Sequence, residues 1–107
     1  MLRNIHFFNI KPGADEARIL SLVDHELVEY ATAFGCLERK TWKLLDAHAR
    51  GKPVESATYL NESLWPSQKA ADAFSQAERP EDVKKWWKEL ADGLEIVKTV
   101  RYVDVEG

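Results

Sequence analysis

The first strand predicted by the hydrophobic pattern carries apolar side chains on both of its faces. In RNIHFFNIKPG, residues 3–13, a period of two places Ile5 and Phe7 on one face, and on the other Asn4, His6, Phe8 and Ile10. Neither face is polar enough to be left in water. We therefore expect both faces of this strand to be covered, including the one that carries the histidine.

A helix is predicted directly after this strand. Pro12 and Gly13 break the extended pattern, and Asp15 can cap a helix that starts near Glu16. Gly35 stands where a left-handed C-terminal cap is expected. Spacings of three and four residues give the helix one apolar stripe, formed by Ile19, Leu22, Val23, Leu27, Tyr30, Ala31 and Phe34.

Two strands and their connection follow the helix. Residues 36–46, CLERKTWKLLD, mix apolar and charged positions in the way typical of an edge strand. Residues 47–56 are polar and contain Gly51 and Pro53, which predicts a long hairpin loop. Residues 57–65, ATYLNESLW, predict a third strand.

The last third of the chain predicts two helical segments and a final strand. Pro66 starts a helix that we expect over residues 67–77. A second helix is expected over residues 80–93, PEDVKKWWKELADG, with its proline at the first position. Residues 95–105 are β-branched and alternate in polarity, which predicts a fourth strand.

This order of elements predicts an α+β fold of the ferredoxin-like, βαββαβ type. Two right-handed crossovers then place the helices on one face of a four-stranded antiparallel sheet. The other face also carries apolar side chains, and a second copy of the same sheet is its simplest cover. We therefore expect an obligate homodimer that is joined through its sheets, with an interface well above about 1,600 Å².

Composition narrows the class of protein. The 107 residues are 45% hydrophobic and 31% charged, which predicts one folded domain over residues 1–107. The net charge of −3 comes from mixed charges with no basic cluster, so we expect no nucleic acid partner. No signal peptide and no membrane-spanning run is evident, and we expect no membrane partner. A lone cysteine, Cys36, fits a reducing cytoplasm.

Four segments together resemble the dimeric α+β barrel superfamily: FFNIKPGAD (residues 7–15), FGCLERKTW (34–42), LWPSQKAADAF (64–74) and RYVDVE at the end of the chain. The superfamily includes stress-responsive barrel domains, monooxygenases of the antibiotic-biosynthesis type and haem-degrading relatives. The resemblance implies dimerisation through the sheets. It also implies a pocket for aromatic or polycyclic molecules, either between the sheet and the helices or within the joint barrel.

The branches of this superfamily imply different chemistry. The monooxygenase-like branch oxidises an electron-rich substrate with O₂ and without a cofactor, and Trp65 matches a tryptophan common there near the end of strand three. The haem-degrading branch has a strand-one asparagine, at or beside His6, and a histidine in helix two, which residues 67–77 lack. Haem binding is therefore a second alternative only. Members that use a strand-one histidine as acid or base are closer, and we expect no cofactor and no metal.

His6 is the candidate acid or base. Aromatic neighbours would lower its pKa by desolvation and leave a neutral imidazole that can accept a proton. Tyr59 and Asn61 share a strand face with Trp65, within reach of His6, and this set would suit a planar, hydroxylated ligand. Further expected pocket residues are Asn4, Phe8 and Trp42. In the alternative reading, His6 is a hydrogen-bonded core residue, and Tyr59 and Trp65 fill the dimer core.

Glu62 is a secondary candidate. A regular strand turns it away from Tyr59 and toward the helices, and a bulge or a shift of one residue would be needed to make it a partner for His6. Trp86 and Trp87 fit packing better than a ligand site. We expect His25 and His48 to be solvated.

Two classes of function remain open from the sequence. The first is an enzyme or binding protein that takes an aromatic ligand beside His6 and Trp65. The second is a non-catalytic, stress-related or structural dimer in which the same residues pack. A cavity of roughly 300 Å³ or more next to His6 would favour the first, and a filled core there would favour the second.

Overall fold

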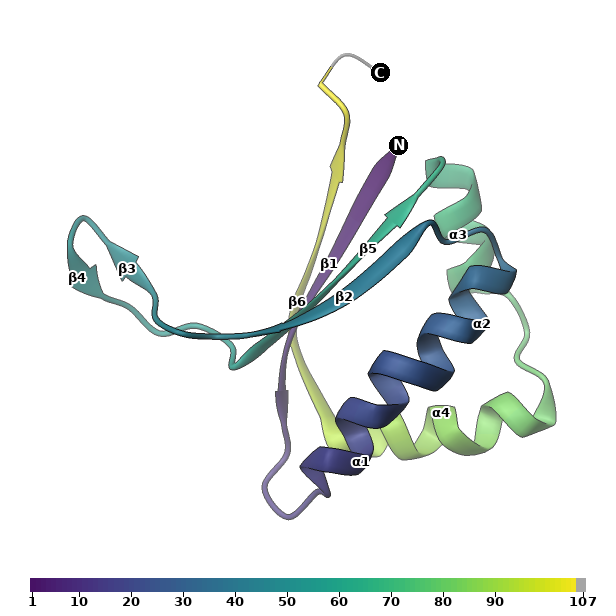
Figure 1. Ribbon diagram of the computed structural model, residues 1–107, viewed down its shortest axis with the longest axis horizontal. Coiled ribbons are helices and arrows are strands. Elements are labelled where there is room, and N and C mark those ends of the chain that lie inside the picture. Colours follow the sequence, from purple (N-terminus) through teal and green to yellow (C-terminus); the bar gives the residue numbers. More distant parts are fainter. Residues whose placement is uncertain (106–107) are drawn as a thin grey trace.

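One four-stranded antiparallel sheet organises residues 1–105, the part of the chain that the computed structural model describes (Figure 1). The order of its strands is β2-β5-β1-β6, and the helices pack on one of its sides. This confirms the predicted ferredoxin-like α+β fold and the pairing of the first strand with the third long strand. The elements are β1 Leu2–Ile10, α1 Glu16–Ser21, η1 Leu22–Glu26, α2 Leu27–Ala33, β2 Glu38–Lys43, β3 His48–Ala49, β4 Lys52–Pro53, β5 Tyr59–Trp65, α3 Gln68–Gln76, α4 Glu81–Gly93 and β6 Leu94–Val103.

The predicted helix boundaries are confirmed by their caps. Asp15 accepts a hydrogen bond from the Arg18 backbone N–H at 3.1 Å, at the start of α1. Ser67 accepts one from the Ala70 N–H at 3.1 Å, at the start of α3. Gly35 follows α2 with a φ of 97°, in the left-handed region that favours glycine.

The first helical segment contains a π-helical turn, η1, that the sequence pattern did not predict. The pattern steps by five residues between Leu22 and Leu27, and the wider turn keeps both side chains buried. Apolar spacing alone is compatible with an unbroken helix, because a single five-residue step changes the stripe very little.

Residues 47–56 form a small hairpin of β3 and β4, where a long loop was expected. Arg50 and Gly51 make its turn with φ values of 52° and 77°. Positive φ at both central residues matches the twist of paired strands, so a short hairpin is possible there. The hairpin extends away from the helices (Figure 1).

The sheet faces are assigned differently from the sequence-based expectation. Leu2 and Trp65 belong to the core that the helices cover, together with helix residues such as Leu22 and Phe74. Glu62 has the opposite parity on β5 and lies on the face away from the helices. The expectation that Glu62 faces the helices is therefore wrong. Strand alternation groups residues by face, but it does not say which face the helices cover.

The face away from the helices is mixed in character. Arg3 bridges the carboxylates of Glu62 and Glu38 there, at 3.4 and 3.6 Å. Its apolar members come from all four strands of the described sheet: Ile5, Phe7, Trp42, Leu60, Leu64, Val100 and Tyr102. Trp42 is 46% exposed and Tyr102 60% exposed. This face therefore leaves large apolar side chains in contact with water in the isolated protomer.

Gly93 closes the packing between α4 and the first helix. It is buried, and a Cβ placed on it would overlap Ile19 Cδ1 and lie 2.9 Å from Ile19 Cγ1. The absence of a side chain thus allows α1 and α4 to approach each other closely. Among the described residues, none of the helices combines the length and the apolar character that crossing a bilayer requires.

Candidate functional site

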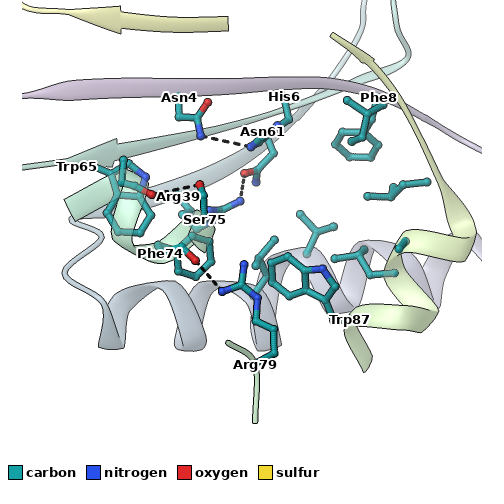
Figure 2. A pocket seen from close by; sticks show the side chains of 17 residues that line it. Asn4, His6, Phe8, Arg39, Asn61, Trp65, Phe74, Ser75, Arg79 and Trp87 are labelled. Atoms are coloured by element: carbon teal, nitrogen blue, oxygen red, sulfur yellow. Dashed lines mark hydrogen bonds between the residues drawn. The ribbon is translucent and has the colours of Figure 1, made fainter. Parts of the chain in front are cut away.

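A cavity of about 400 Å³ lies between the helix-facing side of the sheet and the helices (Figure 2). Its volume is within the range of small-molecule sites. Most of its wall is apolar, with aromatic rings from Phe8, Trp65, Phe74 and Trp87. Six polar side chains also line it. The strands contribute Asn4, His6, Arg39 and Asn61, α3 contributes Ser75, and the connection between α3 and α4 contributes Arg79.

His6 is held by neighbours on both ring nitrogens. Nδ1 lies 2.9 Å from Thr99 Oγ1 on β6, and Nε2 lies 3.4 Å from Asn4 Nδ2 (Figure 2). An amide nitrogen can only donate, so Nε2 is the acceptor and Nδ1 carries the proton. Burial, with a smaller effect from the positive charge of Arg39, lowers the pKa of His6 from 6.5 to about 4. The imidazole is therefore neutral at pH 7.

Asn61 lines the cavity from β5 and is linked by hydrogen bonds to β2 and, through Thr41, to η1. Its Oδ1 accepts from Arg39 Nη2 at 2.5 Å, and its Nδ2 donates to Thr41 Oγ1 at 3.0 Å. Thr41 in turn donates to Asp24 Oδ1 on η1 at 2.7 Å. Asn61 lies directly opposite His6 in the β1–β5 register. This network fixes the orientation of the amide and of the guanidinium next to His6.

Arg79 closes the helical side of the cavity from the connection between α3 and α4. Its Nη1 donates to the Phe74 carbonyl at 2.6 Å. The guanidinium lies 4.1 Å from the ring centre of Trp87 and 4.8 Å from that of Phe74. The guanidinium of Arg79 is thus stabilised by one hydrogen bond to a backbone carbonyl and by cation–π contacts with two aromatic rings.

Trp65 forms part of both the core and the cavity wall. It is 1% exposed, and its Nε1 donates to Ser63 Oγ at 3.0 Å. Its ring centre lies 5.2 Å from that of Phe74 on α3. The indole is thus held rigidly, with its polar atom satisfied within the strand.

The structure brings together five of the residues singled out from the sequence. These five line one cavity and are Asn4, His6, Phe8, Asn61 and Trp65. The pocket lies under the helices, which is one of the two locations implied by the resemblance, and the alternative in which Trp65 fills a sheet-to-sheet dimer core does not fit this position.

Three other singled-out residues lie outside the cavity. Trp42 and Glu62 are on the opposite sheet face, where Trp42 Nε1 donates to Glu62 Oε1 at 3.1 Å. Tyr59 does face the helices, but its ring stacks on Phe8 at 5.4 Å and its hydroxyl donates to the Glu16 carboxylate. The grouping of Trp42 with His6 is wrong, because residue parity on β2 places Trp42 on the other face of the sheet. The β1–β5 pairing runs without the bulge or shift that would have brought Glu62 to His6.

Several cavity residues were not singled out as site residues from the sequence. Arg39 was included among the charges of an edge strand, although it shares its face with Thr41 and the pattern of alternation could have identified it. Trp87 was assigned to packing, and with Phe74 it packs around Tyr30 as well as lining the cavity. Arg79 lies in a connection, and no periodic pattern places such a residue.

The remaining candidates lie away from the cavity. His25 and His48 are exposed, as predicted. Cys36 is buried, its Sγ donates to the Glu38 carbonyl at 3.3 Å, and burial raises the pKa of its thiol. A thiol of this kind is a structural residue, since nucleophilic cysteines require a stabilised thiolate.

Comparisons with solved structures support the fold over almost the whole chain. HapK from Hahella chejuensis superposes with a TM-score of 0.72 at 11% identity, covering 100% of this chain and 95% of that one. SnoaB from Streptomyces nogalater, a cofactor-independent oxygenase, has a TM-score of 0.69 at 10% identity, covering 96% and 91%. A hydroxynitrile lyase from Passiflora edulis has a TM-score of 0.70 at 20% identity, covering 99% and 94%.

No protein-family model and no curated protein matches the sequence. These three structural matches have identities of 10 to 20% and include different reactions, so they establish the fold and leave the chemistry open. The fold that the resemblance implied is confirmed at this level: the chain has the same protomer fold as HapK, SnoaB and the hydroxynitrile lyase.

Proposed function

We propose that this protein binds a planar aromatic molecule in the cavity beside His6 and oxidises it with O₂ without a cofactor, in the manner of a monooxygenase. The observation that carries the proposal is the cavity itself. At about 400 Å³ it exceeds the roughly 300 Å³ expected of a ligand site, and aromatic rings form its walls while His6 and Asn61 supply polar groups at one side.

The geometry of His6 supports a role as proton acceptor. Its Nδ1–H donates to Thr99, so the lone pair of Nε2 is available to a ligand hydroxyl that displaces the 3.4 Å contact with Asn4. Loss of the hydroxyl proton makes an aromatic ring more electron-rich and easier for O₂ to oxidise. The similarity of the fold to SnoaB, a cofactor-independent oxygenase, is consistent with this reaction class.

We also propose that the protein acts as a homodimer joined through the face of the sheet opposite the helices. That face exposes Trp42 and Tyr102 and carries Phe7 and Leu60 as a cross-strand pair. A second copy of the same face would remove these side chains from water. Its charged members include Arg3 and Glu62, which already lie 3.4 Å apart and would enter the interface as a pair.

A non-catalytic dimer is the alternative, and one observation favours it. Both nitrogens of His6 already have partners within the chain, Thr99 and Asn4, as a structural histidine would. Haem binding is the weaker alternative. The haem-degrading branch has an asparagine in strand one and a histidine in the second helix, and α3, which corresponds to that helix, contains no histidine. Titration with hemin tests it, since a Soret band that weakens in His6→Ala would be required.

The test of the proposed function separates binding from turnover. Phenols, naphthols and hydroquinones are titrated against the fluorescence of the cavity tryptophans, and O₂ uptake is measured with each compound that binds. We expect His6→Gln to abolish O₂ uptake while retaining binding. The matched control is His25→Gln, which removes an exposed histidine and is expected to leave both measurements unchanged.

Two results would contradict the proposal. Equal turnover in the wild type and His6→Gln would remove His6 from the mechanism. Binding without any O₂ uptake across the panel would support the non-catalytic alternative, in which the cavity serves only to hold a ligand.

A further inference from the structure

Arg39 is a cation without a counter-ion at the wall of the cavity. Its Nη2 donates to Asn61 Oδ1 at 2.5 Å, while its Nε is buried and has no hydrogen-bond partner in the described part of the chain. No carboxylate of residues 1–105 lies within ion-pair distance of it, although Arg3, Arg18 and Arg101 each have one. The amide of Asn61, which is neutral, is thus the side chain that holds this guanidinium.

The charge of the cavity is opposite in sign to that of the chain. The protein has 18 acidic and 15 basic residues and a net charge of −3. Among the described residues that line the cavity, however, Arg39 and Arg79 are charged and none is aspartate or glutamate. Neither has a carboxylate partner among these residues, but Arg79 donates to a carbonyl and lies against aromatic rings, whereas Arg39 has a buried N–H without an acceptor.

A partly buried cation without an anion beside it is unfavourable. Burial lowers the pKa of the Arg39 guanidinium, which is the direction expected when a charge has lost water and gained no anion. The nearby thiol of Cys36 supplies no anion, because burial raises its pKa and keeps it protonated. A planar guanidinium binds a carboxylate through two parallel N–H donors, and Arg39, which lines the cavity, has no carboxylate partner among the described residues. The cavity wall therefore presents an incomplete ion pair.

We propose that the ligand of this cavity is a planar aromatic carboxylate whose carboxylate group pairs with Arg39. The inference rests on the proposed binding of an aromatic molecule and adds its substrate class. In this arrangement the rings lie between the aromatic walls, with the carboxylate at Arg39 and a ring hydroxyl on the same edge, toward His6. Asn61 lies between the two polar ends, since it bonds Arg39 and faces His6 across the strands.

Binding of an anion would also change His6. The charged groups that line the cavity with it are Arg39 on β2 and Arg79 between α3 and α4, and Arg101 on β6 is paired with Asp72 of α3 at 2.9 Å. Arg39 contributes to the low pKa of His6, so a carboxylate that neutralises it would move the pKa of His6 upward. His6 would then be a stronger proton acceptor in the complex than in the free protein.

The experiment compares two ligands of nearly equal shape, 2-naphthoate and its neutral amide, 2-naphthamide. Affinities are measured by calorimetry and by quenching of tryptophan fluorescence. We expect the wild type to bind the carboxylate at least about tenfold more tightly than the amide. Arg39→Gln should abolish this preference, and Arg39→Lys should retain part of it. Lys85→Gln, which removes an equal charge from the exposed side of α4, should leave it unchanged.

The comparison of the two ligands on the wild type needs no variant, so a folding defect in Arg39→Gln does not decide the outcome. Equal affinity for carboxylate and amide would overturn the inference and leave the proposed function standing. Failure of both compounds and of neutral naphthols to bind would overturn the proposed function, and the inference with it.

Discussion

His6 and Thr99 lie opposite each other in the β1–β6 register, and Nδ1 of the histidine is 2.9 Å from Oγ1 of the threonine. The hydroxyl of Thr99 can donate or accept, so the amide nitrogen of Asn4 at Nε2, which can only donate, selects the tautomer with its proton on Nδ1. Asn4 thus determines which nitrogen of the cavity histidine can accept a proton.

Asn4→Leu should release this control. Loss of the amide donor to Nε2, a hydrogen bond worth about 1 kcal/mol, is expected to shift the tautomer equilibrium several-fold toward the form protonated at Nε2. The ¹⁵N chemical shifts of the His6 imidazole, recorded near pH 7.5, measure this shift. Thr32→Val serves as control, because Thr32 donates to the Val28 carbonyl on α2, away from His6. Unchanged ¹⁵N shifts in Asn4→Leu would contradict the assigned role of Asn4.

The buried state of His6 predicts a pH dependence of stability. Its pKa is about 4 in the folded protein and 6.5 for an unperturbed histidine, so the unfolded chain binds more protons between these values. The contribution of His6 is therefore fully present above pH 6.5 and is lost as the pH falls toward 4. We expect a loss of up to about 3 kcal/mol in the free energy of unfolding over this window.

Urea unfolding at constant protein concentration, from pH 7 to pH 4, measures this loss. His6→Gln should flatten the dependence, while His25→Gln, at an exposed position, should follow the wild type. If His6→Gln lost stability with falling pH as steeply as the wild type, the low pKa of His6 would not be responsible.

Phe7→Glu should dissociate the proposed dimer. Phe7 and Leu60 are cross-strand neighbours on the face away from the helices. Lys98 Nζ lies 4.9 Å from the Phe7 ring centre, so association would bury a carboxylate at position 7 together with this ammonium, at the desolvation cost of both charges. We expect the dissociation constant to rise at least about a hundredfold, measured by sedimentation and light scattering. The control is Ala73→Glu on the exposed side of α3. A wild type that is monomeric at micromolar concentration would contradict the sheet-to-sheet dimer.

Gly93→Ala should destabilise the protomer through a single contact. The new methyl group would overlap Ile19 Cδ1, which belongs to a side chain that is 3% exposed and has little room to move. We expect a loss of about 1 to 3 kcal/mol in the free energy of unfolding. Ile19→Val removes that methyl group, so in a double-mutant cycle the two substitutions should cost less together than the sum of their separate effects. Strict additivity would contradict the contact.

Much of the candidate site follows from the alternation of β1 and β5. Asn4, His6 and Phe8 share one parity, and Asn61 and Trp65 share another, so pairing the two strands brings them together. Trp42 was also expected in the pocket, and Glu62 was a secondary candidate that needed a bulge or a shift of one residue; the structure places both on the far face. Trp42 belongs to the opposite parity once the start of β2 is known, and a pattern of mixed charges does not define that start.

Arg39 illustrates a different limit. In the sequence it is one of several charges on an edge strand, where a solvated side chain is the ordinary expectation. Its partial burial depends on η1 and α2, which pack against that strand only after the chain has folded. Arg79 is comparable, because its position depends on the aromatic rings from α2 and α4 that surround it.

The order of the long strands and the helices, the helix caps and the ferredoxin-like fold follow from the sequence alone, because hydrophobic periodicity and capping act over a few neighbouring residues. Three properties appear only in the folded chain: which sheet face the helices cover, the cavity that remains beneath them, and the lack of an anion beside Arg39 among the described residues. These properties depend on packing between elements distant in the chain, and a local pattern does not specify what such elements leave unfilled.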